Sequence, residues 1–87
     1  MYLIMVYDIK VKRVAKVLRI ARKYLTWVQN SALEGEITEA KFEKLKSELK
    51  KIINKDKDSI LFYTFREKTY TSREAMGIEK SKEELIL

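Results

Sequence analysis

The first apolar segment of the chain is Tyr2–Asp8, in which six apolar or aromatic residues run without a polar break until a carboxylate ends the run. Unbroken apolar runs of this length are typical of strands buried on both faces, whereas a half-exposed strand alternates apolar and polar positions. Ile4 and Val6 add the β-branched side chains that strands favour. The pattern predicts a strand at the centre of a sheet, covered on both faces.

Two later segments, residues 11–25 and 38–54, show the three- and four-residue spacing of amphipathic helices. The apolar stripe of the first consists of Val14, Val17, Leu18, Ala21, Tyr24 and Leu25. The stripe of the second consists of Phe42, Leu45, Leu49, Ile52 and Ile53. Thr38 is a suitable N-cap for the second helix, and Glu39 suits its first turn. We therefore expect one helix in each of these ranges.

Residues 26–37 alternate well enough to be strand, but the segment is long for a single strand in so small a domain. Asn30-Ser31 is its best turn pair and Gly35 its best bulge position. Two short antiparallel strands and one strand bent near Ser31 both fit this pattern.

Residues 59–65 (SILFYTF) are rich in β-branched and aromatic side chains and predict a further strand. Its aromatic residues could stack on bases, as they do in the RNA-recognition motif, whose strands and helices follow the same order. The glycine-containing signature of that motif is absent from this segment. Core packing is therefore the better account of Phe62, Tyr63 and Phe65.

The order strand–helix–strand–strand–helix–strand is the ferredoxin-like βαββαβ plan, in which two helices cover one face of an antiparallel sheet. The chain ends in the apolar residues 85–87, and we expect an extra strand over about 79–87 that pairs with a partner subunit. In this plan the helices cover one face of the sheet, whereas the first strand is predicted to be buried on both faces. If the open faces of two subunits pack against each other, both predictions can hold. We therefore expect one α+β domain over residues 1–87 that forms a homodimer.

The composition restricts the chemistry that this chain can perform. It has no Cys and no His, which excludes a disulfide framework, a zinc site of the usual ligands, a Cys or Ser–His nucleophile pair and a histidine base. Carboxylates, hydroxyls, Lys, Arg, Tyr and a bound metal remain. No apolar segment has the pattern of a signal peptide or the length of a membrane span, so we expect a cytoplasmic protein with no membrane partner.

The net charge of +6 lies in the first third of the chain: residues 1–30 hold seven Lys and Arg against one acid, and residues 31–87 hold twelve of each sign. The basic residues of the first helix are Lys12, Arg13, Lys16, Arg19, Arg22 and Lys23. No acid interrupts them, so the stripe lacks the i,i+4 pairing of an ordinary solvated face. We favour contact with the phosphates of a nucleic acid over the solvated-face interpretation.

Asp8 is the acid that ends the first strand, and it is the only acid in this basic third of the chain. Open α/β sheets tend to bind ligands at the carboxyl ends of their strands, which makes Asp8 a candidate ligand-binding residue. Asp is also a good N-cap, so Asp8 could merely cap the helix that follows. Position alone leaves both interpretations open.

Several segments together resemble the small CRISPR-associated endoribonuclease family, the second of the two core proteins of CRISPR spacer acquisition. They are Tyr2–Ile9 (YLIMVYDI), Arg13-Val14 with the helix behind it, Trp27–Gly35 (WVQNSALEG), the SILFYTF strand at its spacing, and Gly77-Ile78. The resemblance covers nearly the whole chain. It implies a ferredoxin-like homodimer in which Asp8 faces its symmetry mate and binds a divalent metal, Mg²⁺ or Mn²⁺.

By the same resemblance Tyr7 lies beside the site, and Arg13 and Ser31 occupy positions tied to activity. In the mechanism that we expect, Arg13 steadies the phosphate, Ser31 contributes a hydrogen bond and Tyr7 shapes the site. Two positions depart from the family pattern, because Leu33 stands where Phe is usual and Trp27 replaces an arginine.

The implied function is metal-dependent endonuclease activity on single-stranded RNA or double-stranded DNA, as part of spacer acquisition and antiviral defence with a CRISPR integrase as partner. Two alternatives remain. One is a non-catalytic scaffold that bridges integrase dimers on DNA, for which the same basic stripe would serve. The other is a ribonuclease toxin of the related virulence-associated type.

Overall fold

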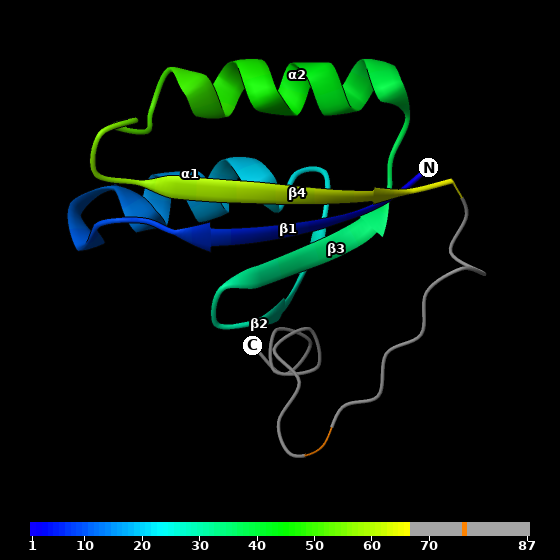
Figure 1. The fold of residues 1–87 in the computed structure, drawn as a ribbon, viewed down its shortest axis with the longest axis horizontal. Coiled ribbons are helices and arrows are strands. Elements are labelled where there is room, and N and C mark those ends of the chain that lie inside the picture. The colour runs from blue at the N-terminus through cyan, green and yellow to red at the C-terminus, as the bar shows by residue number, and fades with distance from the viewer. Residues whose placement is uncertain (67–75, 77–87) are drawn as a thin grey trace.

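The computed structural model of the chain describes residues 1–66 and residue 76. Its elements follow the expected order of strand, helix, two strands, helix and strand (Figure 1). They are β1 (Tyr2–Asp8), α1 (Val11–Ala21), β2 (Thr26–Gln29), β3 (Ala32–Glu36), α2 (Glu39–Lys50) and β4 (Ser59–Phe65). The strand expected over 79–87 lies outside the described residues.

The strands form one antiparallel sheet in the order β2-β3-β1-β4. The apolar run of β1 predicted a central strand, and β1 indeed lies between β3 and β4. Both helices pack on the same side of the sheet, because their buried residues join one cluster with those of β1 and β3. The ferredoxin-like α+β fold expected from the sequence is confirmed.

The core fills the space between this face of the sheet and the helices. Its largest fully buried side chains are Leu3, Met5, Leu33, Leu45, Leu49 and Val17. Phe62 of β4 meets Phe42 of α2 edge-on, with 5.1 Å between ring centroids, an arrangement that aromatic pairs prefer. Both apolar helix stripes predicted by the sequence therefore face the sheet.

The helices are shorter than the sequence predicted. α1 ends at Ala21 instead of residue 25, because the chain turns through residues 22–24 and carries Leu25 into the core, where its N–H donates to the carbonyl oxygen of Ala21 at 2.9 Å. α2 ends at Lys50 rather than near residue 54. Neither helix of the described residues has the length and apolar character needed to cross a membrane.

The segment 26–37 forms two strands joined by a turn at Asn30 and Ser31, the first of the two expected arrangements. The irregularity in their pairing falls between Trp27 and Gln29, so the expectation of a bulge at Gly35 is wrong. The N-cap prediction is confirmed, since the Thr38 hydroxyl accepts a hydrogen bond from the N–H of Lys41 at 3.2 Å.

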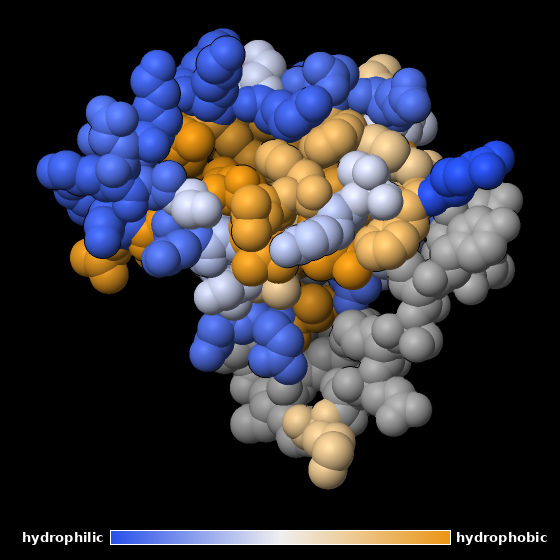
Figure 2. Space-filling model, viewed as in Figure 1, coloured by the Kyte–Doolittle hydropathy of each residue, from blue (hydrophilic) through white to orange (hydrophobic). Residues whose placement is uncertain are grey.

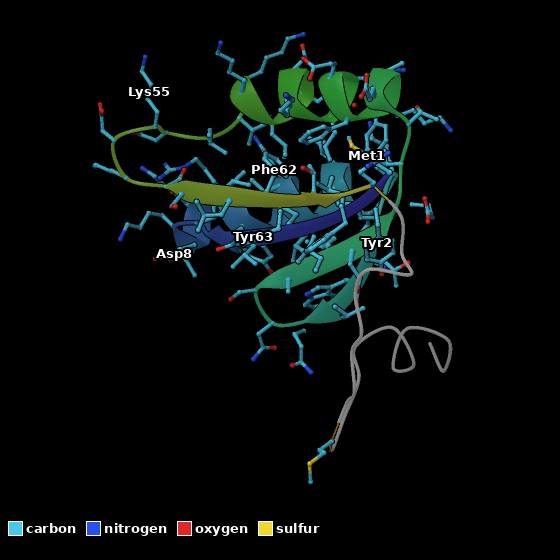
Figure 3. All side chains as sticks on the ribbon, turned by 45° about the vertical axis from the view of Figure 1, so that its right-hand side comes forward. Met1, Tyr2, Asp8, Lys55, Phe62 and Tyr63 are labelled. Carbon is cyan, nitrogen blue, oxygen red and sulfur yellow. The ribbon has the colours of Figure 1, made fainter. Side chains whose placement is uncertain are left out.

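No helix of the described residues covers the other face of the sheet. Val6 of β1 lies opposite Leu61 of β4 on this face, and Ile4 lies opposite Tyr63. Leu61 is 53% exposed and Tyr63 51% exposed, and Figure 2 shows apolar side chains gathered over the strands. Core packing therefore accounts for Phe62 but is wrong for Tyr63, since neighbours on a strand point to opposite faces (Figure 3). Among the residues that the structure describes, helices therefore cover one face of β1 and leave the other open.

Candidate active site and nucleic-acid surface

The candidate site lies at the end of the sheet where β1 ends and β4 begins. Asp8 is the last residue of β1 and pairs with Ser59, the first residue of β4. The β2–β3 turn reaches the same end, because the N–H of Tyr7 donates to the carbonyl oxygen of Ser31 at 3.0 Å. Figure 3 shows Asp8 at this end of the molecule, with Met1 and Tyr2 at the opposite end.

The Asp8 side chain is exposed, and it does not cap α1. The helix begins at Val11 with Lys10 as its N-cap residue, and the Lys10 side chain makes no capping hydrogen bond. Among the described residues, the Asp8 carboxylate has no hydrogen-bond or ion-pair partner. The capping interpretation of Asp8 is therefore wrong, and its carboxylate is available to a ligand.

The acids of residues 1–66 do not form a complete metal site within one chain. Within the described residues no three acidic side chains come together closely enough to hold a metal ion. The whole sequence lacks His and Cys. Mg²⁺ is satisfied by one or two carboxylates together with water and phosphate oxygens. The described residues of one chain therefore fit as the donor of a single ligand, Asp8.

Tyr7 lies next to Asp8 in sequence, but its side chain points to the opposite face of the sheet. The phenol is buried in the helix-covered core and donates a hydrogen bond to the carbonyl oxygen of Asn30. Burial raises the pKa of this hydroxyl above its ordinary value, and a hydrogen bond with Trp27 partly opposes the shift. The phenol of Tyr7 therefore supports the β2–β3 turn from the core side, and the expectation that Tyr7 helps shape the site stays a prediction.

Ser31 lies in that turn with its side chain exposed, at the same end of the sheet as Asp8.

The two positions that depart from the expected family pattern, Leu33 and Trp27, have structural roles. Leu33 is fully buried in the core. Trp27 packs against the core, and the guanidinium of Arg22 lies 5.9 Å from its ring centroid.

Arg13 lies on Asp58, an acid of the turn before β4. Its Nε donates to Oδ2 of Asp58 at 2.6 Å and its Nη2 donates to Oδ1 at 3.0 Å. The side chains are 14% and 0% exposed. The structure thus gives Arg13 a different use from the predicted phosphate contact, since its guanidinium is held by a buried acid.

Asp58 accepts two more hydrogen bonds, from the N–H of Lys10 at 2.9 Å and from the N–H of Asn54 at 2.8 Å. The hydrogen bonds from Arg13 hold the pKa of Asp58 well below its usual range; burial opposes this, and the two N–H groups lower the pKa further. Asp58 therefore stays ionised. Its hydrogen bonds tie the start of α1 to Asn54, in the connection after α2, and to the residue before β4.

Besides Arg13, the predicted nucleic-acid contacts include a group of exposed cations in α1 and a paired lysine in the turn that follows the helix. Lys12, Lys16 and Arg19 are exposed and have no ion-pair partner among the described residues. Lys23, in contrast, pairs with Glu48 of α2, with Nζ 2.6 Å from Oε1. The first group therefore presents unneutralised positive charge to solvent.

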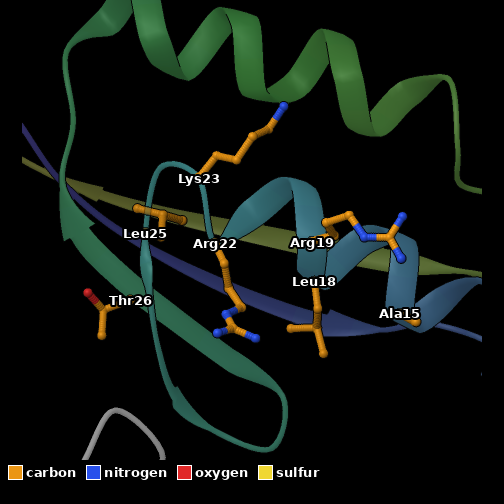
Figure 4. Close-up of a pocket in the computed structure, with 7 residues that line it drawn as sticks. All are labelled: Ala15, Leu18, Arg19, Arg22, Lys23, Leu25 and Thr26. Atoms are coloured by element: carbon orange, nitrogen blue, oxygen red, sulfur yellow. The ribbon is translucent and has the colours of Figure 1, made fainter. Parts of the chain in front are cut away.

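An open pocket of about 620 Å³ adjoins this surface, between the second half of α1 and the start of β2. It is lined by Ala15, Leu18, Arg19, Arg22, Lys23, Leu25 and Thr26. Figure 4 shows Lys23 reaching toward α2, whereas Arg22 and Leu18 point the other way. The pocket combines an apolar floor with the cations Arg19 and Arg22.

A family model described as "CRISPR associated protein Cas2" matches residues 1–73 of the chain. The chain belongs to the Cas2 family. A Dictyoglomus turgidum protein named CRISPR-associated endoribonuclease Cas2 is 60% identical over 87 residues, 100% of both chains. A Thermotoga maritima protein of the same name is 51% identical over 86 residues, 99% of both chains.

Solved Cas2 structures share this fold. One crystal structure of Cas2 has a TM-score of 0.83 and 42% identity, covering 93% of this chain and 91% of its own. Streptococcus pyogenes Cas2 has a TM-score of 0.78 and 31% identity, covering 88% of this chain and 100% of its own. The resemblance drawn from the sequence is therefore confirmed.

Asp58 is the residue of this Cas2 site region that the sequence interpretation missed. It lies in the polar segment Lys55–Asp58, which reads as an ordinary solvated turn. Asp56, two residues earlier, is exposed, and nothing local to the sequence separates the two acids. The long-range contact with Arg13, 45 positions away, distinguishes them.

Proposed function

We propose that this Cas2 family member is a metal-dependent endonuclease of CRISPR adaptation that cleaves phosphodiester bonds in single-stranded RNA or double-stranded DNA. One observation carries the proposal: the exposed carboxylate of Asp8, which has no partner within the part of the chain that the structure describes, stands at the end of the central strand where the cationic helix α1 begins. The endoribonuclease name of the relatives from D. turgidum and T. maritima supports it. The proposed location is the cytoplasm, where a CRISPR integrase would be its partner.

The active unit that we propose is a homodimer, because the described residues of each chain supply one ligand. The open face of the sheet, with Leu61 and Tyr63 half exposed, is an apolar surface that a second copy would cover. Such packing would bring the two Asp8 residues toward one two-fold axis. β4 is an edge strand among the described residues, and the predicted strand over 79–87 of the partner would pair with such an edge.

The proposed cofactor is Mg²⁺, with Mn²⁺ able to replace it, and the Asp8 carboxylates of the two chains would hold it. When bound, such an ion makes a coordinated water more acidic and offsets negative charge on the phosphate. The residues of the chain bind and orient the substrate. Ser31, exposed at the same end of the sheet, would donate a hydrogen bond to a phosphate oxygen.

The exposed cations of α1 would hold the nucleic-acid backbone. Lys12, Lys16 and Arg19 present charge without reading bases, so the binding we propose is independent of sequence. Arg22, on the wall of the adjoining pocket, would extend this surface along the helix. Lys23 contributes less than the sequence pattern predicted, because Glu48 neutralises it.

The same surface favours one rival function, a non-catalytic scaffold that holds duplex DNA between integrase dimers. The cations of α1 would serve the scaffold equally well, whereas the scaffold does not need the Asp8 carboxylate. Spacer acquisition in cells that carry Asp8→Asn separates the two functions. Loss of acquisition supports the nuclease, and normal acquisition supports the scaffold.

The test of the proposed function is a cleavage assay with RNA and with duplex DNA, each with and without Mg²⁺. We expect cleavage by the native protein to require the metal and Asp8→Asn to abolish it. Asp56→Asn is the matched control, since it makes the same change at an exposed acid in the turn before β4. Equal cleavage by Asp8→Asn and the native protein would contradict the proposal.

A further inference from the structure

We propose that Asp58 and Arg13 are positioning residues that fix the direction of the Asp8 carboxylate. The inference rests on the proposed function, in which Asp8 holds the metal. Neither residue needs to touch the substrate for this role. Both act through the backbone that links β1 to α1.

The first step is that the direction of the Asp8 carboxylate is not set by contacts of its own side chain within the described residues. Among the described residues, no hydrogen bond or ion pair holds its carboxylate. Its direction therefore depends on the backbone of Asp8 and on the two residues that follow it. A site that must receive a metal and a phosphate loses activity when its ligands are loosely held.

The second step is that two neighbouring residues, Asp58 and Ser59, anchor this backbone at both ends. Ser59 pairs with Asp8 in the ladder between β1 and β4. Oδ1 of Asp58 accepts the N–H of Lys10 at 2.9 Å. Ile9 lies between the two anchored residues. The connection from β1 to α1 is thus fixed against the start of β4.

The third step is that Arg13 fixes Asp58 in turn. Its two hydrogen bonds engage both carboxylate oxygens, and the Asp58 side chain is fully buried. The N–H of Arg13 also donates to the carbonyl oxygen of Lys10 at 2.9 Å. Lys10, Arg13 and Asp58 therefore form a closed ring of hydrogen bonds two residues after Asp8. Two-point recognition of a carboxylate by Arg is geometrically specific.

A merely structural ion pair would affect folding alone, and the chain offers a control for that case. Lys23 and Glu48 join the turn after α1 to α2 with the same 2.6 Å separation as Arg13 and Asp58, but they lie beyond the other end of α1. Glu48→Gln breaks a pair between elements and leaves the β1–α1 connection intact. A positioning role predicts that Asp58→Asn and Glu48→Gln differ in more than stability.

The experiment compares the native protein, Asp58→Asn, Arg13→Lys and Glu48→Gln well below their unfolding temperatures. The first measurement is the Mn²⁺ concentration that gives half-maximal cleavage. We expect it to rise roughly 10- to 100-fold in Asp58→Asn, as it does when groups that orient a metal ligand are removed. Arg13→Lys keeps the charge but loses the two-point geometry, so it should show a smaller rise. Glu48→Gln should match the native protein.

The second measurement needs no cleavage: NMR order parameters of the Asp8 and Ile9 amides. They should fall below those of the rest of β1 in Asp58→Asn and stay native in Glu48→Gln. A folded Asp58→Asn with native order parameters and native Mn²⁺ dependence would overturn the inference. If Asp58→Asn does not fold, the same native results in Arg13→Lys would overturn it. Unchanged cleavage by Asp8→Asn would instead sink the proposed function, and the order parameters would still decide the positioning role.

Discussion

Asp8 and Asp58 lie at the same end of the sheet, beside neighbouring strands, and their surroundings are opposite. The Asp58 side chain is fully buried and accepts hydrogen bonds from Arg13, Lys10 and Asn54. Asp8 is exposed and has no partner among the described residues. A carboxylate whose acceptor sites are filled holds the fold together, whereas one with empty acceptor sites can take a ligand. The comparison supports the metal-binding role proposed for Asp8 and shows why Asp58 would act only through the backbone that it holds.

The largest effect that the comparison predicts is the loss of activity in Asp8→Asn. We expect cleavage to fall on the order of 100-fold or more, because the metal loses a ligand. The melting temperature should stay within about 2 °C of native, since an exposed side chain without partners is replaced. The cleavage assay measures the expected loss of activity, and calorimetry measures the expected constancy of the melting temperature. A large fall in melting temperature would show that Asp8 also holds the fold.

Asp58→Asn should have the opposite profile in stability. The change leaves the Arg13 guanidinium beside a neutral amide in a buried place, and we expect the melting temperature to fall by roughly 10 °C. Asp56→Asn, at an exposed acid of the same turn, should have little effect. Thermal unfolding followed by circular dichroism measures both. Equal melting temperatures for the two variants would remove the distinction between Asp58 and an ordinary surface acid.

The cations of α1 show the same contrast between paired and solvent-exposed charge. Arg13 forms an ion pair with Asp58, whereas Lys12, Lys16 and Arg19 face solvent. Replacing Lys12, Lys16 and Arg19 with Gln should weaken binding to all nucleic-acid sequences and reduce the salt slope of log affinity by roughly 2 to 3. The control replaces three exposed lysines of α2, Lys41, Lys44 and Lys50. An equal loss of slope in the control would mean that net charge alone, and not this face, sets the affinity.

The smallest predicted effect concerns pH. Because the pKa of Asp58 is lowered in the folded state, its ionised form stabilises the fold fully at pH values above the unfolded pKa of about 4. This contribution is lost as the pH falls below that value. The difference in melting temperature between the native protein and Asp58→Asn should therefore narrow in acid. A gap that stays constant from pH 7 to pH 3 would contradict the role of the ionised pair.

Sequence reasoning recovered most of the fold because the apolar spacing is regular. The unbroken run of β1 predicted the central strand, and the stripes of α1 and α2 predicted the helix faces that pack on the sheet. The helix ends were less predictable. α1 ends at Ala21, where the following turn carries Leu25 into the core, and α2 ends at Lys50, although the apolar pattern continues past both residues.

The site was only partly predictable for a related reason. Asp8 is visible in the sequence because it ends an apolar run before a basic helix. The use of Arg13 depends on an acid 45 positions away, and the direction of the Tyr7 phenol depends on which face of β1 the helices cover. Contacts distant in sequence decide both, so a reading of neighbouring residues could not assign them.

The central claim is that two chains share one site through their Asp8 residues, and mixed dimers test it most directly. Native protein and Asp8→Asn are unfolded together, refolded at several ratios, and assayed for metal-dependent cleavage. If both carboxylates are needed, activity should follow the square of the native fraction, about one quarter of full activity in an equal mixture with random pairing. Activity that falls in direct proportion to the native fraction would mean that each chain works alone, and the shared site would be wrong.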